Sequence, residues 1–262
     1  FDMGRSVVAP FLWNRGIRSI DHVIGTHPQL DHVGGLAWIL AHFQVEKFWT
    51  NGAERQEEFW RRIERAMVQR KLEATVATEG RLISEGPACR MVVLNPQPRP
   101  ESSISAKSES LNNLSVVTEL VCREQRVLFT GDIEREALTR LTHSGNSAHI
   151  ALLKVPHHGA KSSLERRWLE TIRPAVGVVS AGRRNPYGHP AGEVLAAYQA
   201  VETQVWRTDR DGAIWADLDL TRQELSMHST REWILQPALP SADIWSVEQD
   251  NLRRLWRRWN WT

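Results

Sequence analysis

Side chains that bind metal ions in proteins gather in four short segments of this sequence. The segments hold five histidines and two aspartates: His27, Asp31 and His32, then Asp132, then His157 and His158, and finally His189. Imidazole and carboxylate groups together suit Zn²⁺, Mn²⁺ or Fe²⁺, and a shared carboxylate lets two cations lie close together. The residue types therefore predict a site for one or two divalent metal ions.

The first segment, His27 to His32, holds three candidate ligands within six residues. Such a stretch predicts a tight turn, which can point its donors at one centre. A histidine-rich surface loop would show the same spacing, so the segment by itself does not decide. The Gly-Asp, His-His-Gly and Gly-His-Pro segments farther along the chain make the metal hypothesis much stronger.

Each candidate segment follows an apolar run that predicts a β-strand. The strands expected before the four segments span residues 21–26, 126–130, 150–155 and 175–180. Ligand sites in open α/β sheets form outside the carboxyl ends of strands, so loops that are far apart in sequence can converge there. The alternation of these strands with helical stretches favours a layered α/β fold.

Other elements are expected around this sheet. Helices are predicted from Gly34 through Leu40 and over residues 54–73, where the apolar residues have near-helical spacing. The stretch from Pro96 to Ser110 predicts a surface loop. Further strands are expected at residues 75–77, 81–83, 90–94, 114–122 and 204–208, with a terminal hairpin over residues 212–220.

Composition sets wide limits on class and function. The 262 residues, 41% hydrophobic and 24% charged, fit one globular domain. Because the net charge is only +2, attraction to a polyanion must rest on local patches. No run of about 18 apolar residues predicts a membrane span. Cys89 and Cys122 lie in predicted strands, where they either pair in an oxidising compartment or stay as buried thiols.

The segment from Thr26 to Leu36 resembles the His-x-His-x-Asp-His signature of metallo-β-lactamase-fold hydrolases. Later segments resemble one branch of that family, the C-terminal domains of ComEC-type bacterial DNA-uptake channels: residues 112–115, 128–134, 153–159 and 185–190. The resemblance runs from about Pro10 to about Ile214 and implies a four-layer αββα fold. We expect a hydrolase domain over residues 1–225 and a basic, tryptophan-rich tail over residues 226–262.

By this resemblance the candidate residues acquire expected roles. The expected ligands are His27 for one ion, Asp31 and His32 for the second, Asp132 as the bridge, and His157 and His189 to complete the shells. The expected catalytic residues are His158, Asp132 and Lys154, and the expected substrate contacts are Asn113, Ser115 and Asn185. The division among the three later histidines stays open, because one of them can act as a general acid for the leaving oxygen.

Two departures from the family pattern stand out. Gln29 occupies the position where the wider family has His and ComEC-like proteins usually have Asp, and a neutral amide is a poor ligand. The usual third histidine of the same ion site is also absent, with Asn112 or Asn113 in the corresponding region. Only 26 residues precede His27, so the first strands of the fold are expected to be missing and a sheet edge to be exposed.

The resemblance implies hydrolysis of a phosphodiester at a pair of cations, which would activate water and neutralise developing charge without an organic cofactor. Four basic residues flank the motif loops, where they either contact phosphates or are simply solvated: Lys154, Lys161, Arg183 and Arg184. Ser162 and Ser163 are expected to cap the following helix. The tail from Trp245 to Trp261 suggests a stacking or membrane-interface segment, or a helix docked on its own domain.

Three functions remain in competition. The leading hypothesis is a deoxyribonuclease that degrades the non-transported DNA strand, in an extracytoplasmic domain that follows a membrane channel in the same bacterial polypeptide. The second is a separate hydrolase of another ester or phosphodiester. The third, which Gln29 motivates, is a non-catalytic domain that guides DNA.

Overall fold

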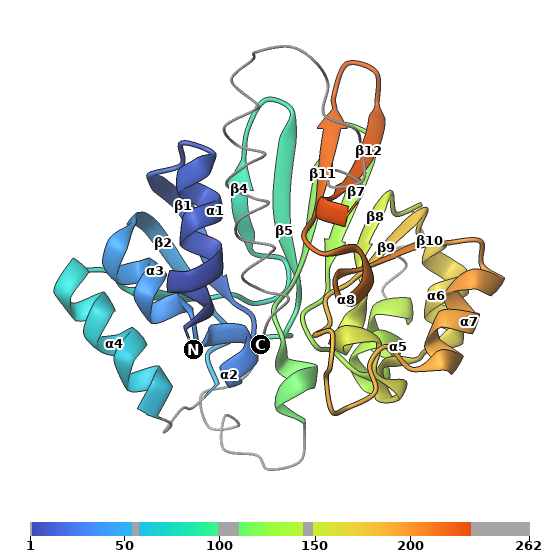
Figure 1. The fold of residues 1–262 in the computed structure, drawn as a ribbon, viewed down its shortest axis with the longest axis horizontal. Coiled ribbons are helices and arrows are strands. Elements are labelled where there is room, and N and C mark those ends of the chain that lie inside the picture. The colour runs from blue at the N-terminus through green and yellow to red at the C-terminus, as the bar shows by residue number, and fades with distance from the viewer. Residues whose placement is uncertain (1, 54–57, 99–109, 144–148, 232–262) are drawn as a thin grey trace.

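The computed structural model describes residues 2–53, 58–98, 110–143 and 149–231 (Figure 1). The strands are β1 (Ser19–Gly25), β2 (Gln44–Thr50), β3 (Ala74–Val76), β4 (Leu82–Glu85), β5 (Cys89–Asn95), β6 (Val117–Cys122), β7 (Gln125–Phe129), β8 (Leu152–Lys154), β9 (Val176–Val179), β10 (Gln204–Arg207), β11 (Ile214–Asp219) and β12 (Glu224–Ser229). The α-helices are α1 (Ala9–Asn14), α2 (Leu30–Val33), α3 (Leu36–His42), α4 (Glu58–Arg70), α5 (Arg135–His143), α6 (Arg166–Ile172), α7 (Gly192–Ala200) and α8 (Thr208–Asp211). A π-helix, η1 (Gly4–Val8), precedes α1, and the 3₁₀ helices are η3 (Leu111–Leu114), η4 (Pro156–Gly159) and η5 (Lys161–Ser163).

The smaller sheet is parallel and has the order β1-β2-β3, so β1 forms one of its edges. The sequence pattern predicts β1 and β3 but gives no signal for β2. Glu46 and Lys47 are exposed in the middle of β2, and only its last three residues are buried. Because the apolar run is interrupted, β2 lacks the continuous pattern of a buried strand.

The larger sheet has the order β10-β9-β8-β7-β6-β5-β4. Strands β7 to β10 are parallel, and strands β4 to β7 pair antiparallel. The strands predicted at residues 114–122 and 126–130 correspond to β6 and β7, which pair antiparallel as a hairpin. Parallel strands end at one edge, so the segments after β7, β8 and β9 meet on the same side of the sheet.

Three buried clusters define the layers of the fold. Phe48 and Ile63 belong to a cluster between the smaller sheet and helices α3 and α4. Trp49 and Val93 belong to a second cluster that joins the two sheets face to face. Leu153 lies in a third cluster, which packs the larger sheet against α5, α6 and α7. The order is helix, sheet, sheet, helix, as Figure 1 shows, and the predicted αββα architecture is confirmed.

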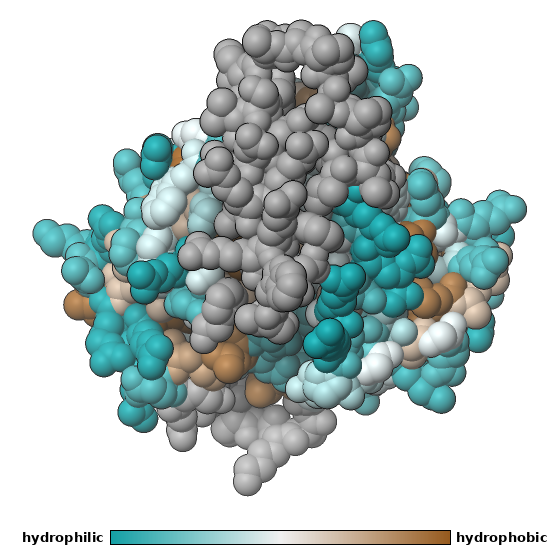
Figure 2. All heavy atoms as spheres, viewed as in Figure 1, coloured by the Kyte–Doolittle hydropathy of each residue, from teal (hydrophilic) through white to brown (hydrophobic). Residues whose placement is uncertain are grey.

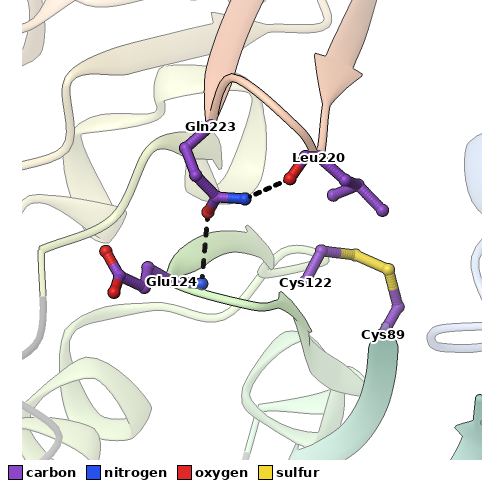
Figure 3. Close-up of a disulfide and its surroundings, with 5 residues drawn as sticks. All are labelled: Cys89, Cys122, Glu124, Leu220 and Gln223. Atoms are coloured by element: carbon purple, nitrogen blue, oxygen red, sulfur yellow. Dashed lines mark hydrogen bonds between the residues drawn. A yellow bond between two sulfur atoms is a disulfide. The ribbon is translucent and has the colours of Figure 1, made fainter. Parts of the chain in front are cut away.

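A disulfide joins the antiparallel strands β5 and β6 where β5 begins and β6 ends. Cys89 of β5 pairs directly with Cys122 of β6, with their Cα atoms 4.1 Å apart. The β11–β12 hairpin lies beside this end, where the Gln223 side chain accepts a hydrogen bond from the Glu124 amide at 3.4 Å (Figure 3). Of the two alternatives for the cysteines, the structure shows the paired one.

Several predicted features fall at the margins of the described residues. The boundary predicted between residues 225 and 226 lies inside β12, and the division into a domain and a tail stays a prediction. The tail from Trp245 to Trp261 and residues 99–109 of the predicted loop lie outside the described residues. In the described part, none of the helices has the length and hydropathy needed to cross a membrane. On the side of the molecule that Figures 1 and 2 share, the described residues at the surface are mostly hydrophilic (Figure 2).

Candidate metal centre

The turn after β1 places the first group of candidate ligands. His27 lies two residues after the end of the strand and is only 1% exposed. The chain then turns through Gln29, whose carbonyl accepts from the amide of His32 at 3.0 Å, and enters the short helix α2. Asp31 and His32 therefore lie on one helical turn, whereas the sequence predicted a tight turn without a helix.

A glycine brings the end of β7 close to a second segment. Gly131 has a φ of +54°, and a Cβ atom added to it would lie 2.6 Å from Cβ of Ser115. The absence of a side chain lets the Ser115 hydroxyl accept a hydrogen bond from the Asp132 amide at 3.0 Å. This contact helps hold the Asp132 carboxylate, which is 1% exposed, at the edge where the parallel strands end.

The two histidines after β8 have a strained backbone. His157 has a φ of 45° and His158 a φ of 54°, both in the left-handed region that non-glycine residues rarely adopt. Each such residue costs on the order of 1–3 kcal/mol, and the surrounding structure must hold it in place. The planes of the two rings lie at 66° to each other, so the rings face different directions.

Four side chains converge at one point. His32 Nε2 lies 3.0 Å and His158 Nε2 3.2 Å from Asp132 Oδ2, and the two nitrogens are 3.3 Å apart. Asp31 Oδ2 lies 3.7 Å from His32 Nε2 and 3.5 Å from His158 Nε2. All four donor atoms lie within 4.8 Å of one another, which makes the group a candidate metal centre.

The outer nitrogens of the converging rings face oxygen atoms. His158 Nδ1 lies 2.6 Å from the carbonyl oxygen of Ser180, which can only accept, so this nitrogen carries a proton. His32 Nδ1 lies 3.3 Å from the Thr26 hydroxyl. A histidine that ligates a metal usually donates its other N–H to such an oxygen, which leaves the inner nitrogen available for the ion.

The protonation states of Asp132 and His158 balance the charge of the group. Burial opposes ionisation of Asp132, but the contacts with His158 and His32 outweigh burial and hold the pKa of this carboxyl well below its usual range. Burial also disfavours the charged form of His158, yet contacts with Asp132 and Asp31 raise its pKa to about 9. A cation that enters the centre must displace the His158 proton, so metal binding is coupled to pH.

The donor set fits a divalent cation. Asp132 Oδ2 is buried, and two imidazole nitrogens lie beside it at 3.0 and 3.2 Å. With zinc–nitrogen distances of about 2.0 Å, donors around a tetrahedral ion lie about 3.3 Å apart. The three closest separations of the group, 3.0, 3.2 and 3.3 Å, have this size.

The chain is similar in sequence to a known superfamily and to known proteins. A family model described as the metallo-beta-lactamase superfamily matches residues 1–87, which include the turn after β1 and helix α2. The chain is 30% identical over 223 residues to ComE operon protein 3 of Bacillus subtilis (strain 168), a match that covers 82% of this chain and 26% of that protein. The chain is therefore similar to proteins of the metallo-β-lactamase superfamily. The resemblance to the ComEC family, predicted from the motifs, is confirmed.

Recombination protein 2 of Haemophilus influenzae (strain ATCC 51907 / DSM 11121 / KW20 / Rd) is 25% identical over 229 residues, which are 87% of this chain and 26% of that protein. The chain therefore spans about a quarter of the length of these curated relatives. Among solved structures, the metallo hydrolase Igni18 from Ignicoccus hospitalis KIN4/I matches with a TM-score of 0.44 and 15% identity, over 80% of each chain.

The residues that alter the first ion site, Gln29 and Asn112, contact each other in the structure. The Gln29 amide donates to the Asn112 side-chain oxygen at 2.9 Å, so the two residues that replace expected ligands bond to each other. His27 lies next to them, and its buried Nε2 atom has no hydrogen-bond partner. Burial, followed by the neighbouring charge of His32, lowers the pKa of His27 to about 4, which keeps its ring neutral at pH 7.

The other two predicted histidine ligands lie outside the group of four. His157 Nε2 is 3.9 Å from Asp132 Oδ2, while its Nδ1 lies 3.2 Å from Glu134 Oε1. His189 contacts His157 ring against ring, with the centroids 5.9 Å apart. His158, predicted as catalytic, instead lies among the candidate ligands, so the structure favours it over His157 and His189 for that role.

Three of the other predicted site residues make internal contacts. Lys154 Nζ lies 3.4 Å from Asp132 Oδ1 and donates to the Gly131 carbonyl at 2.8 Å, so it holds the carboxylate from behind. Asn113 and Ser115 are buried, and Asn113 Oδ1 accepts from the amide of Glu134 at 2.8 Å. These contacts favour a positioning role over the predicted contact of Asn113 and Ser115 with substrate.

Sequence reasoning missed the residues that support the ligands. Glu134 accepts from the Ser162 hydroxyl at 2.8 Å and contacts His157, but it appeared in the sequence only as part of a motif. The Ser180 contact uses a backbone oxygen and leaves no signal in the residue type. The prediction that Ser162 and its neighbour cap the next helix is wrong, because the Glu165 side chain caps α6.

Proposed function

We propose that this domain is a divalent-metal-dependent phosphodiester hydrolase whose substrate is DNA. The observation that carries the proposal is the convergence of Asp31, His32, Asp132 and His158, in which the buried Asp132 Oδ2 lies 3.0 and 3.2 Å from two imidazole nitrogens. The superfamily supports a metal-dependent hydrolase. The relationship to ComE operon protein 3 and the motif resemblance to DNA-uptake channels support DNA as the substrate.

The four side chains would hold the ion, and the chain around them fixes their direction. A divalent cation such as Zn²⁺ or Mn²⁺ supplies Lewis-acid stabilisation of phosphoryl charge and a water of lowered pKa. Lys154 and the Ser115 hydroxyl hold Asp132 from two sides. His157, half-buried beside the group and backed by Glu134, is placed to give a proton to a leaving oxygen.

We further propose that one ion is sufficient for this centre. In the two-ion arrangement that the resemblance implies, the first ion needs ligands at the positions of Gln29 and Asn112. Those two amides bond to each other instead, and neither supplies a charge. The donor set of the second ion is complete in the described residues, so the expected stoichiometry is one ion per chain.

The proposed setting is extracytoplasmic, next to a membrane channel in the same polypeptide. The Cys89–Cys122 disulfide supports it, because disulfides persist in oxidising compartments. The relatives support the larger protein, since the chain matches about a quarter of each. Degradation of the non-transported strand is the proposed task in that setting.

Cleavage of labelled single-stranded DNA tests the hydrolase. The chain is first stripped with a chelator, then assayed with Mn²⁺ or Zn²⁺, alongside Asp132→Ala and Gln29→Asp. We expect metal-dependent cleavage that Asp132→Ala abolishes and Val68→Ala, on the exposed face of α4, leaves unchanged. Binding of both metal and DNA without any cleavage would favour a DNA-guiding domain, and full activity in Asp132→Ala would refute the centre.

A further inference from the structure

One aromatic side chain near the metal centre is almost fully solvated. Tyr187, in the loop between β9 and α7, is 77% exposed, the largest exposure among the described large hydrophobic residues after Val68. Its ring lies on that of His189, with the centroids 5.8 Å apart and the planes at 19°. A tyrosine that served packing would bury its ring, because aromatic side chains stabilise a fold mainly through buried area.

The loop is built to hold this ring outward. The Asn185 side chain donates to the His189 carbonyl at 2.8 Å and accepts from the His189 amide at 2.9 Å. The same Asn185 amide also donates to the Gly182 carbonyl at 2.9 Å. Gly188, with a φ of +69°, completes the turn. These contacts hold residues 185–189 in a fixed turn. The turn keeps the Tyr187 ring exposed to solvent and does not depend on packing of that ring in a hydrophobic core.

A series of ring contacts connects Tyr187 with the metal centre. His189 contacts His157 with a centroid separation of 5.9 Å, and His157 contacts the candidate ligand His158 at 6.2 Å. Tyr187 therefore lies at the outer end of a series of rings that begins at the candidate ligands. If a phosphate of a nucleic-acid strand binds at the centre, a neighbouring nucleotide of the same strand would lie beside the Tyr187 ring.

We propose that Tyr187 is a stacking residue for a nucleobase of a single-stranded nucleic acid, next to the phosphate that enters the metal centre. The proposal rests on the proposed function and names the strand form of its substrate. An exposed aromatic ring is a platform that accepts any base, since every base has a π-face. A base held in a duplex offers no free face, so the proposal predicts a preference for single strands.

Binding without catalysis tests the stacking. Fluorescence anisotropy in chelator compares labelled oligothymidylate with a matched oligomer whose units lack bases but keep the same phosphates. We expect the chain to bind oligothymidylate more tightly, and Tyr187→Ala to weaken that binding about tenfold. Tyr187→Phe keeps the ring and should retain affinity, Val68→Ala is the matched surface control, and all variants should bind the abasic oligomer alike.

Equal affinity of the unmodified chain for the two oligomers, or equal losses of Tyr187→Ala on both, would overturn the proposal. Failure to bind either oligomer would also overturn it. Hydrolysis plays no part in this measurement, so absence of nuclease activity would refute the proposed function and leave the stacking result to stand separately. If the chain does cleave DNA, Tyr187→Ala should raise KM and change kcat little.

Discussion

Lowering the pH should destabilise the metal-free domain through one buried ring, His27. Its pKa is about 4 in the folded state, against 6.5 in the unfolded chain. The unfolded state therefore binds the proton more readily, and the stability that neutral His27 contributes is complete above about pH 6.5 and lost as the pH falls toward 4. The resulting cost is about 2 kcal/mol at pH 5 and about 3 kcal/mol at pH 4.

Urea unfolding in the presence of a chelator measures this cost. The free energy of unfolding is determined at pH 7.5 and pH 5 for the unmodified chain and for His27→Gln, which cannot be protonated. We expect the unmodified chain to lose about 2 kcal/mol more than the variant over this interval. Equal losses in the two proteins would show that His27 is not held neutral by burial, and would refute the account of the turn after β1.

Three further predictions concern the disulfide and the ligands. Replacing Cys89 and Cys122 together by serine should lower the free energy of unfolding by about 4 kcal/mol, given a sequence separation of 33, as chemical denaturation would show. His158→Asn should weaken Zn²⁺ binding in calorimetry at least tenfold and His157→Asn much less, and the reverse order would exchange their assignments. Elemental analysis should find one ion per chain, and a second ion in Gln29→Asp would show that the amide at this position excludes it.

The positions of the strand ends could be predicted from the sequence because each ligand segment follows an apolar run. The motif around His27 to His32 and the Gly-Asp of Asp132 indicated the edge at which the candidate metal centre lies, since parallel strands bring their ends to one edge. The sequence could not predict that His158, and not His157, lies among the candidate ligands. It depends on two left-handed backbone conformations and on a backbone carbonyl that fixes one ring, and neither leaves a trace in residue type.

Strand β2 was inaccessible for a different reason. Its exposed Glu46 and Lys47 conceal a strand whose stability comes from pairing on both sides and from three buried residues at its end. Tertiary context therefore overrides the local pattern here. The same holds for Gln29, whose absence of charge was visible in the sequence but whose partner, Asn112, lies 83 positions away.

The four donors also have consequences for how the chain folds. Asp31 and His32 extend from the smaller sheet, whereas Asp132 and His158 extend from the larger one, and the span from Asp31 to His158 covers almost half of the chain. Contacts so distant in sequence form late, because closing long loops costs entropy before any contact compensates for it. An ion held by all four would tie the two sheets together and slow their separation. Metal uptake should therefore report completion of folding, and metal removal should speed unfolding far more than it slows refolding.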